Sequence, residues 1–308
     1  TATMTPLPTA TDVPLPTASD TPLPTATDVP PTATNTPEPP TATVAPSATP
    51  TSVPNDLVYV SSSTGGSVDG VPFRDEDILV YDTDAESWAM YFDGSDVGLG
   101  GTDVDAFAFA SDGDLLLSFS GPISIDGLGT VGDADLVLFE PSSTGDDTAG
   151  SFYWFFDGSD VGFDSSGEDI DALALDDDGD LLLSTKSDFD VPGLVGEDED
   201  LVRFEPTQLG AETAGDWHAY FDGSDVELEG RSEDAYGCWR DPSNGDLYLT
   251  ALGDFSVTGS SGDASDAFVC HPETLGANTE CTYGPGLFWN GSGHGFGGEN
   301  VDALAVRR

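Results

Sequence analysis

The stretch IDALALDDDGDLLLST, at residues 170–185, contains two short apolar segments joined by an acidic turn that includes glycine. Related stretches recur as VDAFAFASDGDLLLSF from Val104, EDAYGCWRDPSNGDLYLT from Glu233 and VDALAV from Val301. The last copy lacks its second segment, but residues 56–61 (DLVYVS) match that missing part. The repeat therefore predicts a closed ring of four units, in which the two ends of the chain share one unit.

Each unit is expected to contain four strands, A to D. In the unit used as template these are residues 169–175, 180–185, 200–205 (DLVRFE) and 217–222 (WHAYFD). They are short, rich in Val, Leu and aromatic residues, and bounded by Gly, Asp, Ser or Pro, which is typical of β-strands. The last strand D is expected at residues 286–290 (GLFWN). The aligned aspartates at 105, 171, 234 and 302 are 66, 63 and 68 residues apart, a period typical of propeller blades.

The sequence thus predicts an all-β, four-bladed β-propeller at residues 55–308, with its N- and C-terminal strands in one blade. The DxDG turn between strands A and B resembles NHL-type blades, and the count of four blades resembles the hemopexin fold. The repeat also looks like those of secreted bacterial proteins with Thr/Pro-rich spacers. Neither family's full sequence signature is present, so these resemblances imply an architecture and no activity.

Residues 1–54 have a different composition, with 14 of the 22 prolines and no aromatic residue. Proline removes backbone donors and favours polyproline II, so an extended stalk is expected before the propeller. The density of Thr and Pro is typical of O-glycosylated spacers in secreted and cell-surface proteins. Candidate glycosylation sites are Thr1, Thr3, Thr5, Thr9, Thr11, Thr17, Thr21, Thr25, Thr27, Thr32, Thr36, Thr41, Thr43, Thr49 and Thr51.

The chain is strongly acidic, with 58 Asp and Glu against 7 Lys and Arg and a formal net charge of −51. Such a field repels phosphate backbones and anionic lipids, so we expect no nucleic-acid partner. No apolar run approaches the roughly 20 residues of a membrane helix, so no membrane insertion is expected. Divalent cations are the natural counter-charge; alternatively, the acids only keep the protein soluble.

A first set of candidate cation sites lies at one rim of the ring, where FDGSD loops after strand D meet DxD segments before strand C. Clustered carboxylates raise one another's pKa, and Ca²⁺ would relieve this by taking six to eight oxygen ligands. The alternative is that these residues form Asx turns. Candidate ligands are Asp93 and Asp96 with Asp75 and Asp77, Asp157 and Asp160 with Asp133 and Asp135, and Asp222 and Asp225 with Asp198 and Asp200.

A second candidate site is the central channel. Asp105, Asp171, Asp234 and Asp302 occur once per unit, each followed by Ala, and would stand at the channel mouth if strand A lines the axis. The resemblance to hemopexin-like propellers implies an axial cation there. The alternative is that Ala fits a narrow axis while Asp caps the strand.

Few residues suggest catalysis. The three histidines, His218, His271 and His294, fall on different predicted elements, and no HExxH or GxSxG motif is present. Cys270 and Cys281 flank one hairpin connection and could form a disulfide, as in an exported protein.

We therefore expect a non-enzymatic, Ca²⁺-stabilised structural or adhesive protein, extracellular or at the cell surface. Self-association into a fibre or sheath would use the propeller as a polymer subunit. The alternative is a Ca²⁺-dependent module that binds cell-surface glycans or a protein. A hydrolase is the least favoured reading.

Overall fold

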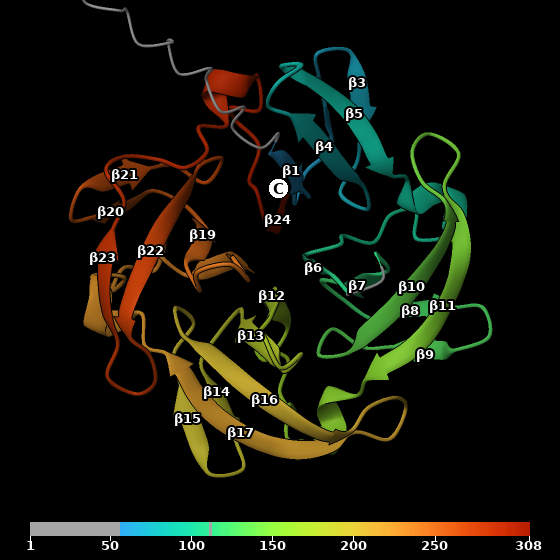
Figure 1. The fold of residues 1–308 in the computed structure, drawn as a ribbon. Helices are drawn as coiled ribbons and strands as arrows, with labels where there is room; N and C mark the ends of the chain where they lie inside the picture. Colours follow the sequence, from blue (N-terminus) through green and yellow to red (C-terminus); the bar gives the residue numbers. More distant parts are fainter. Residues whose placement is uncertain (1–55, 111–112) are drawn as a thin grey trace, which may run out of the picture. The chain divides into compact units, whose positions relative to one another are not determined.

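The computed structural model describes residues 56–110 and 113–308. Four antiparallel sheets of four strands each surround a central axis as the blades of a β-propeller (Figure 1). Among these residues no helix has the length and apolar character that a membrane crossing needs. The predicted four-bladed fold is confirmed, whereas the predicted stalk at residues 1–54, with its candidate glycosylation sites, lies outside the described residues.

Each blade runs from an inner strand at the axis to an outer strand at the rim. Blade 1 contains β6 (Ala106–Phe109), β7 (Leu115–Ser118), β10 (Leu136–Ser143) and β11 (Ala149–Phe156). Blade 2 contains β12 (Ile170–Leu175), β13 (Leu181–Thr185), β16 (Leu201–Gln208) and β17 (Ala214–Phe221). Blade 3 contains β18 (Ala235–Arg240), β19 (Leu247–Ala251), β22 (Ala267–Thr274) and β23 (Glu280–Tyr283). Blade 4 contains β24 (Leu304–Arg307), β1 (Leu57–Val60), β4 (Ile78–Asp82) and β5 (Ser87–Phe92).

Blade 4 closes the ring by joining the two ends of the described chain. Its inner strand β24 pairs antiparallel with β1, with Leu57 opposite Arg307 and Val60 opposite Leu304. The ladder continues beyond the strands, because the Ser61 amide donates to the Ala303 carbonyl at 3.1 Å. The shared blade predicted from the split repeat is therefore confirmed.

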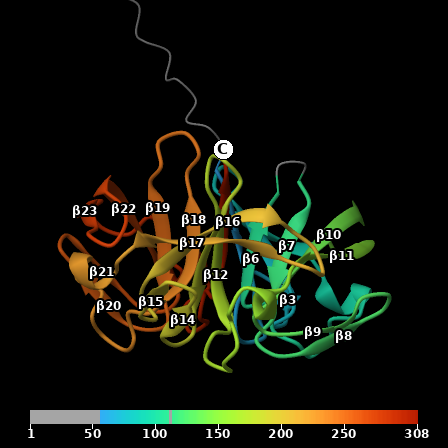
Figure 2. The same ribbon diagram turned by 90° about the horizontal axis from the view of Figure 1, so that it is seen from below.

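The connection between the second and third strands of every blade contains a small hairpin that the four-strand prediction missed. All four hairpins have strands of three residues and lie on one face of the ring, opposite turns such as β18–β19 (Figure 2). In blade 2, Phe189 and Val191 of the hairpin are buried, so it extends the core. The hairpins are β2 (Gly66–Val68) with β3 (Val71–Phe73), β8 (Ile123–Ile125) with β9 (Gly129–Val131), β14 (Phe189–Val191) with β15 (Leu194–Gly196), and β20 (Phe255–Val257) with β21 (Ser260–Gly262).

The outer strand of blade 3 was wrongly predicted at residues 286–290. The strand is β23, Glu280–Tyr283, in which Cys281 and Tyr283 face the core side and alternate with exposed residues. Trp289, from the predicted segment, forms only an isolated bridge with Ala267. Its indole is buried between blades 3 and 4, so the aromatic character of this segment reflects packing outside a strand.

Aromatic and aliphatic side chains fill the spaces between neighbouring blades. Between blades 1 and 2, the rings of Phe156 and Phe204 are fully buried and pack edge to face with centroids 5.2 Å apart. Alanines such as Ala106 and Ala172 occupy the inner strands, where four backbones crowd together. The core is therefore a ring of interblade layers around a narrow axis.

Deleting residues 304–308 tests the closure. The deletion would remove β24 and leave β1 with an unpaired edge, so we expect either no cooperative unfolding or a melting temperature lower by more than about 10 °C. Differential scanning calorimetry of the truncated and full chains would measure this. A truncated chain with unchanged cooperative melting would contradict the role of the β1–β24 pair.

Candidate functional site

The inner strands bring a group of acidic side chains to the axis of the propeller. Asp105, Asp171, Asp234 and Asp302 precede or begin the four inner strands, and each is at most 2% exposed. They lie in one electrostatic environment, since Asp169, Asp302 and Asp171 from other blades all raise the pKa of Asp105. Asp105, Asp171 and Asp302 therefore gather at the axis, and the charge of Asp234 acts on Asp171 beside them.

The structure corrects the alignment of Asp234. The amides of Lys186 and Leu252 donate to the carbonyls of Asp169 and Asp234, which makes Asp234 equivalent to Asp169 and not to Asp171. Tyr236 takes the place of Asp171, because it is the residue bulged out of the β18–β19 pairing as Asp171 is in β12–β13. The equivalent positions 105, 171, 236 and 302 are 66, 65 and 66 residues apart, so the repeat is more regular than the sequence alignment indicates.

The axial carboxylates form two tiers, which we call the axial cluster: Asp105, Asp171 and Asp302 inside, and Asp103, Asp169 and Asp234 nearer the mouth. Tyr236 occupies the fourth position of the inner tier. Burial raises the pKa of its hydroxyl, and the charges of Asp302, Asp103 and Asp171 raise that pKa further. Behind the outer tier stand three of the predicted rim ligands. Asp75 faces Asp103, Asp133 faces Asp169, and Asp198 faces Asp234, each raising the pKa of its partner.

Burial is the main cause of the raised pKa values in the axial cluster. It places the pKa of Asp103 at about 7, that of Asp169 at about 6 and that of Asp234 at about 8. The pKa values of Asp105, Asp171 and Asp302 are raised well above their usual range for the same reason. As ionised groups these carboxylates would be costly unless a proton or a cation neutralised them.

Several carboxylate oxygens of the axial cluster are buried without a hydrogen-bond donor in the described part of the chain. Both oxygens of Asp171, one of Asp105 and one of Asp302 are in this state. The other Asp302 oxygen accepts from the Ser61 hydroxyl at 2.5 Å. Lys186 supplies a cation, with its Nζ 3.5 Å from Asp169, but its side chain is 55% exposed. The cluster therefore has far more buried acid than counter-charge.

The chemistry of this donor set fits a hard cation, because it consists of carboxylate oxygens that lack other partners. Among residues 56–110 and 113–308, however, no three Asp, Glu, His or Cys side chains are grouped so that they could bind a metal ion as they stand. A cation would therefore have to draw the carboxylates together or bind through water.

The remaining predicted rim ligands bind backbone amides in a repeated arrangement. In blade 1, Asp135 accepts from the Gly132 amide at 2.7 Å and from the Gly158 amide at 3.1 Å. Any side chain at Gly158 would overlap the Ala134 carbonyl, which explains the glycine of the FDGSD loop. Asp77 and Asp200 accept equivalent bonds from Gly94 and Gly223. These contacts favour the Asx-type alternative, and Ca²⁺ binding at the rim stays a prediction.

The three FDGSD loops also connect neighbouring blades through a repeated set of hydrogen bonds to a threonine, which we call the latch. The Asp157 amide donates to the hydroxyl of Thr213 in blade 2, and the Thr213 amide donates back to the Asp160 carboxylate, both at 2.9 Å. Thr213 also donates its hydroxyl to the Gly210 carbonyl. The same latch joins Asp93 and Asp96 to Thr148, and Asp222 and Asp225 to Thr279. These threonines were not predicted, although the DTAG and ETAG segments before strand D mark Thr148 and Thr213; Thr279 lies in a different segment, NTEC.

The interface between blades 3 and 4 lacks this latch in the described residues, because NGSG replaces FDGSD there. Aromatic contacts take its place. The Trp88 indole donates to the His294 carbonyl at 2.8 Å and stacks on Phe296, while Trp289 stacks on the His294 ring with centroids 4.1 Å apart. The last interface of the ring is therefore closed mainly by apolar packing.

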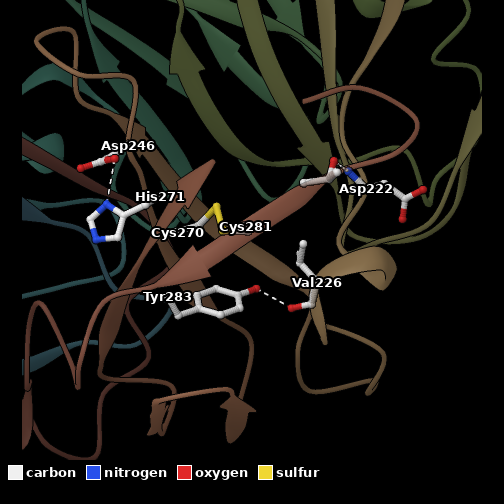
Figure 3. Close-up of a disulfide and its surroundings, with 8 residues drawn as sticks. Asp222, Val226, Asp246, Cys270, His271, Cys281 and Tyr283 are labelled. Carbon is white, nitrogen blue, oxygen red and sulfur yellow. Dashed lines mark hydrogen bonds and ion pairs between the residues drawn. A yellow bond between two sulfur atoms is a disulfide. The ribbon is translucent and has the colours of Figure 1, made fainter. Parts of the chain in front are cut away.

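The predicted disulfide is present in blade 3, where Cys270 on β22 is bonded to Cys281 on β23 (Figure 3). Nearby, Tyr283 donates its hydroxyl to the Val226 carbonyl at 2.6 Å, tying β23 to the preceding blade. His271 pairs with Asp246 at 2.9 Å, and His218 lies 3.4 Å from Glu205. The three histidines contact three different groups, so they are structural neighbours of acids and aromatic rings and do not converge.

The fold defines the class of protein as a four-bladed β-propeller with an acidic axis. No protein-family model matches the sequence, and no curated protein matches it. Virginiamycin B lyase from Staphylococcus aureus is 12% identical with a TM-score of 0.30, over 74% of this chain and 73% of that one. A protein of unknown function from Bacteroides caccae is 11% identical with a TM-score of 0.30, over 82% and 99%. The extracellular domain of a B. thetaiotaomicron protein is 12% identical with a TM-score of 0.27, over 72% and 40%.

These similarities are too low to carry a functional argument, so the site has to be interpreted from its own residues.

Thr213→Val tests the latch. The substitution removes a buried hydroxyl that accepts from the Asp157 amide, and an unpaired buried amide costs about 1–3 kcal/mol. We expect the melting temperature to fall by roughly 3–10 °C. Thr207→Val is the matched control, since Thr207 is exposed on the neighbouring strand. Equal effects of the two substitutions would argue against the latch.

The raised pKa values predict how stability depends on pH without metal. A carboxyl whose pKa is higher in the folded state binds more protons there, so its contribution to stability is present at low pH and is lost as pH rises. For Asp234 the loss falls between about pH 4 and its folded pKa of about 8. Asp234→Asn should therefore gain stability relative to the parent between pH 5 and pH 8.

Thermal melts of both proteins in EDTA would measure this difference, with exposed Asp216→Asn as the control. A difference that stays constant from pH 5 to pH 8 would show that Asp234 is not a buried, proton-binding group.

Proposed function

We propose that this protein is a non-enzymatic, extracellular structural or adhesive propeller whose axial cluster is neutralised by Ca²⁺. The observation that carries the proposal is Asp171, which is 1% exposed and has no hydrogen-bond donor for either carboxylate oxygen in the described residues. A group in that state is unfavourable unless a cation or a proton compensates its charge. Asp105 and Asp302, with one such oxygen each, stand beside it.

A cation is favoured over protons alone because of the number of acids involved. Six carboxylates of the axial cluster face one partly exposed amine, Lys186, and the whole chain has a net charge of −51. Protons can neutralise the inner tier and most of Asp234, whose pKa is about 8, but Asp169 with a pKa of about 6 would be largely ionised at neutral pH and Asp103 with a pKa of about 7 would be about half ionised. A divalent cation at this end of the axis would offset that charge and hold the inner strands together.

The support for an extracellular location comes from two independent features. The Cys270–Cys281 disulfide suits an oxidising compartment. The Thr- and Pro-rich composition of residues 1–54 is that of glycosylated spacers on secreted proteins. A rigid ring on such a spacer suits display or assembly, and self-association into a fibre or sheath remains part of the proposal.

The support for a non-catalytic role is the way the acidic groups are used. At the rim, carboxylates such as Asp135 and Asp160 accept from backbone amides and fix the blades. Near the axis, the carboxylates are buried and surrounded by one another. The rim contacts stabilise the fold directly, and the axial carboxylates would do so once a cation neutralised them.

Calcium dependence tests the proposal. A ligand present at about 100 times its Kd stabilises the folded state by about 2.7 kcal/mol, which is roughly 5–10 °C for a propeller of this size. We expect that rise in melting temperature when Ca²⁺ is added after EDTA treatment at pH 7.5. Asp171→Asn should lose most of the rise, whereas Asp216→Asn, on an exposed outer strand, should keep it.

A melting temperature that is the same in Ca²⁺ and in EDTA would refute the axial cation. A rise that Asp171→Asn leaves intact would place the cation elsewhere. Electron microscopy of the secreted protein would then separate the fibre from the monomer.

A further inference from the structure

A cavity of about 570 Å³ lies on the face of the propeller opposite the axial cluster. It is formed where the inner strands β6, β12, β18 and β24 end, beside turns such as the one that joins β18 to β19 (Figure 2). Its volume is within the range typical of small-molecule sites. Its lining combines aromatic, aliphatic, acidic and cationic side chains, so it differs from the acidic pockets at the other rim.

Blade 3 departs from the repeat at the two positions that face this cavity. Trp239 pairs with Tyr248, and the residues at the equivalent position of the other inner strands are alanines: Ala108, Ala174 and Ala305. The next residue, Arg240, replaces the apolar residues Phe109, Leu175 and Val306. One blade therefore supplies an indole and a guanidinium where the repeat otherwise supplies small or apolar groups.

Cationic side chains are concentrated around this cavity. Arg240 and Arg307 line it, and the Arg308 guanidinium lies 5.7 Å from the centre of the Trp239 ring. These are three of only seven Lys and Arg residues in the chain. Arginine side chains therefore stand beside the three aspartates, Asp176, Asp177 and Asp178, that also line this cavity.

The arginines differ in how they are bound. Arg240 donates two hydrogen bonds to the Asp177 carboxylate, at 2.7 and 2.8 Å, and Arg308 pairs with Asp241 and Asp56. Arg307 forms no ion pair with a carboxylate of the described residues. Its guanidinium lies 3.7 Å from the centre of the Phe109 ring and near Tyr59, which holds it in place.

We propose that this cavity binds an acidic sugar, with the carboxylate of a uronic acid on Arg307 and the apolar face of the ring against Trp239. A fixed guanidinium is the side chain best suited to bind a carboxylate through two hydrogen bonds. An aromatic ring offers the flat surface on which the C–H face of a sugar packs. The acidic turn at residues 176–179 offers acceptors for the sugar hydroxyls. This function lies at the other end of the axis from the proposed cation and does not depend on it.

Isothermal titration calorimetry with the full chain, in EDTA, tests the proposal directly. The probes are glucuronic acid, its neutral parent glucose, and acetate as a carboxylate without a ring. We expect glucuronic acid to bind at least about tenfold more tightly than either of the other two, because a hydrogen-bonded charged contact and the ring contact act together. A change in Trp fluorescence should accompany binding.

Variants assign the binding to this cavity. Arg307→Gln and Trp239→Ala should each weaken glucuronic acid binding at least about tenfold. Arg231→Gln, an exposed arginine on the opposite face, is the matched control and should bind as the parent does. Arg307→Lys keeps the charge and should recover part of the affinity. Circular dichroism melts would confirm that each variant is folded.

Three results would overturn the proposal. They are the absence of heat and of a fluorescence change with glucuronic acid, binding of glucose as tight as that of glucuronic acid, and binding by folded Arg307→Gln equal to that of the parent. Each of these outcomes leaves the Ca²⁺ experiment unaffected, so the two proposals fail separately.

Discussion

Pairing between β1 and β24 is the interaction on which the rest of the structure depends. A propeller blade packs on two neighbours, so each interblade layer is complete only when the ring is closed. The β24 strand contributes Leu304 and Ala305 to the layers on either side of blade 4, and it also brings Asp302 to the axis. Closure therefore supplies both a core layer and one carboxylate of the axial cluster.

The four interfaces of the ring are stabilised in two different ways. Three use a threonine and two aspartates in a polar latch that repeats with the sequence. The fourth, between blades 3 and 4, uses Trp88, Trp289 and Phe296. All four interfaces contain buried apolar side chains, and in three of them the polar latch is added to that packing.

The strands could be predicted from the sequence because each is a short apolar run bounded by turn residues. The shared blade could be predicted because its two halves are recognisable copies of the repeat. Three features of the fold could not be predicted in this way. The hairpin β14–β15 has only three residues per strand, too few for an alternating pattern. The outer strand β23 has one aromatic residue, so the neighbouring GLFWN matched strand D better. In blade 3 the Asp-Ala pair lies two residues earlier than in the other inner strands, so the sequence match aligned Asp234 with Asp171 although its backbone contacts are those of Asp169.

The same reasoning applies to the acidic residues. Their positions in the sequence predict that they gather near the axis and at one rim, and both groups are found there. Which of them bind amides depends on contacts between residues more than fifty positions apart, such as Asp160 with Thr213. A single repeat does not reveal such pairs, although the recurring TAG segments offer a signal for them.

The closing strand also has a consequence for the order in which the chain can fold during synthesis. Blades 1, 2 and 3 are each built from contiguous residues, so each can form soon after its last strand emerges. Blade 4 cannot, since β1 waits through about 245 further residues for β24. Throughout that interval β1 is an exposed edge able to pair with another chain. A nascent chain of this architecture is therefore open to pairing with the wrong strand for as long as β1 lacks β24.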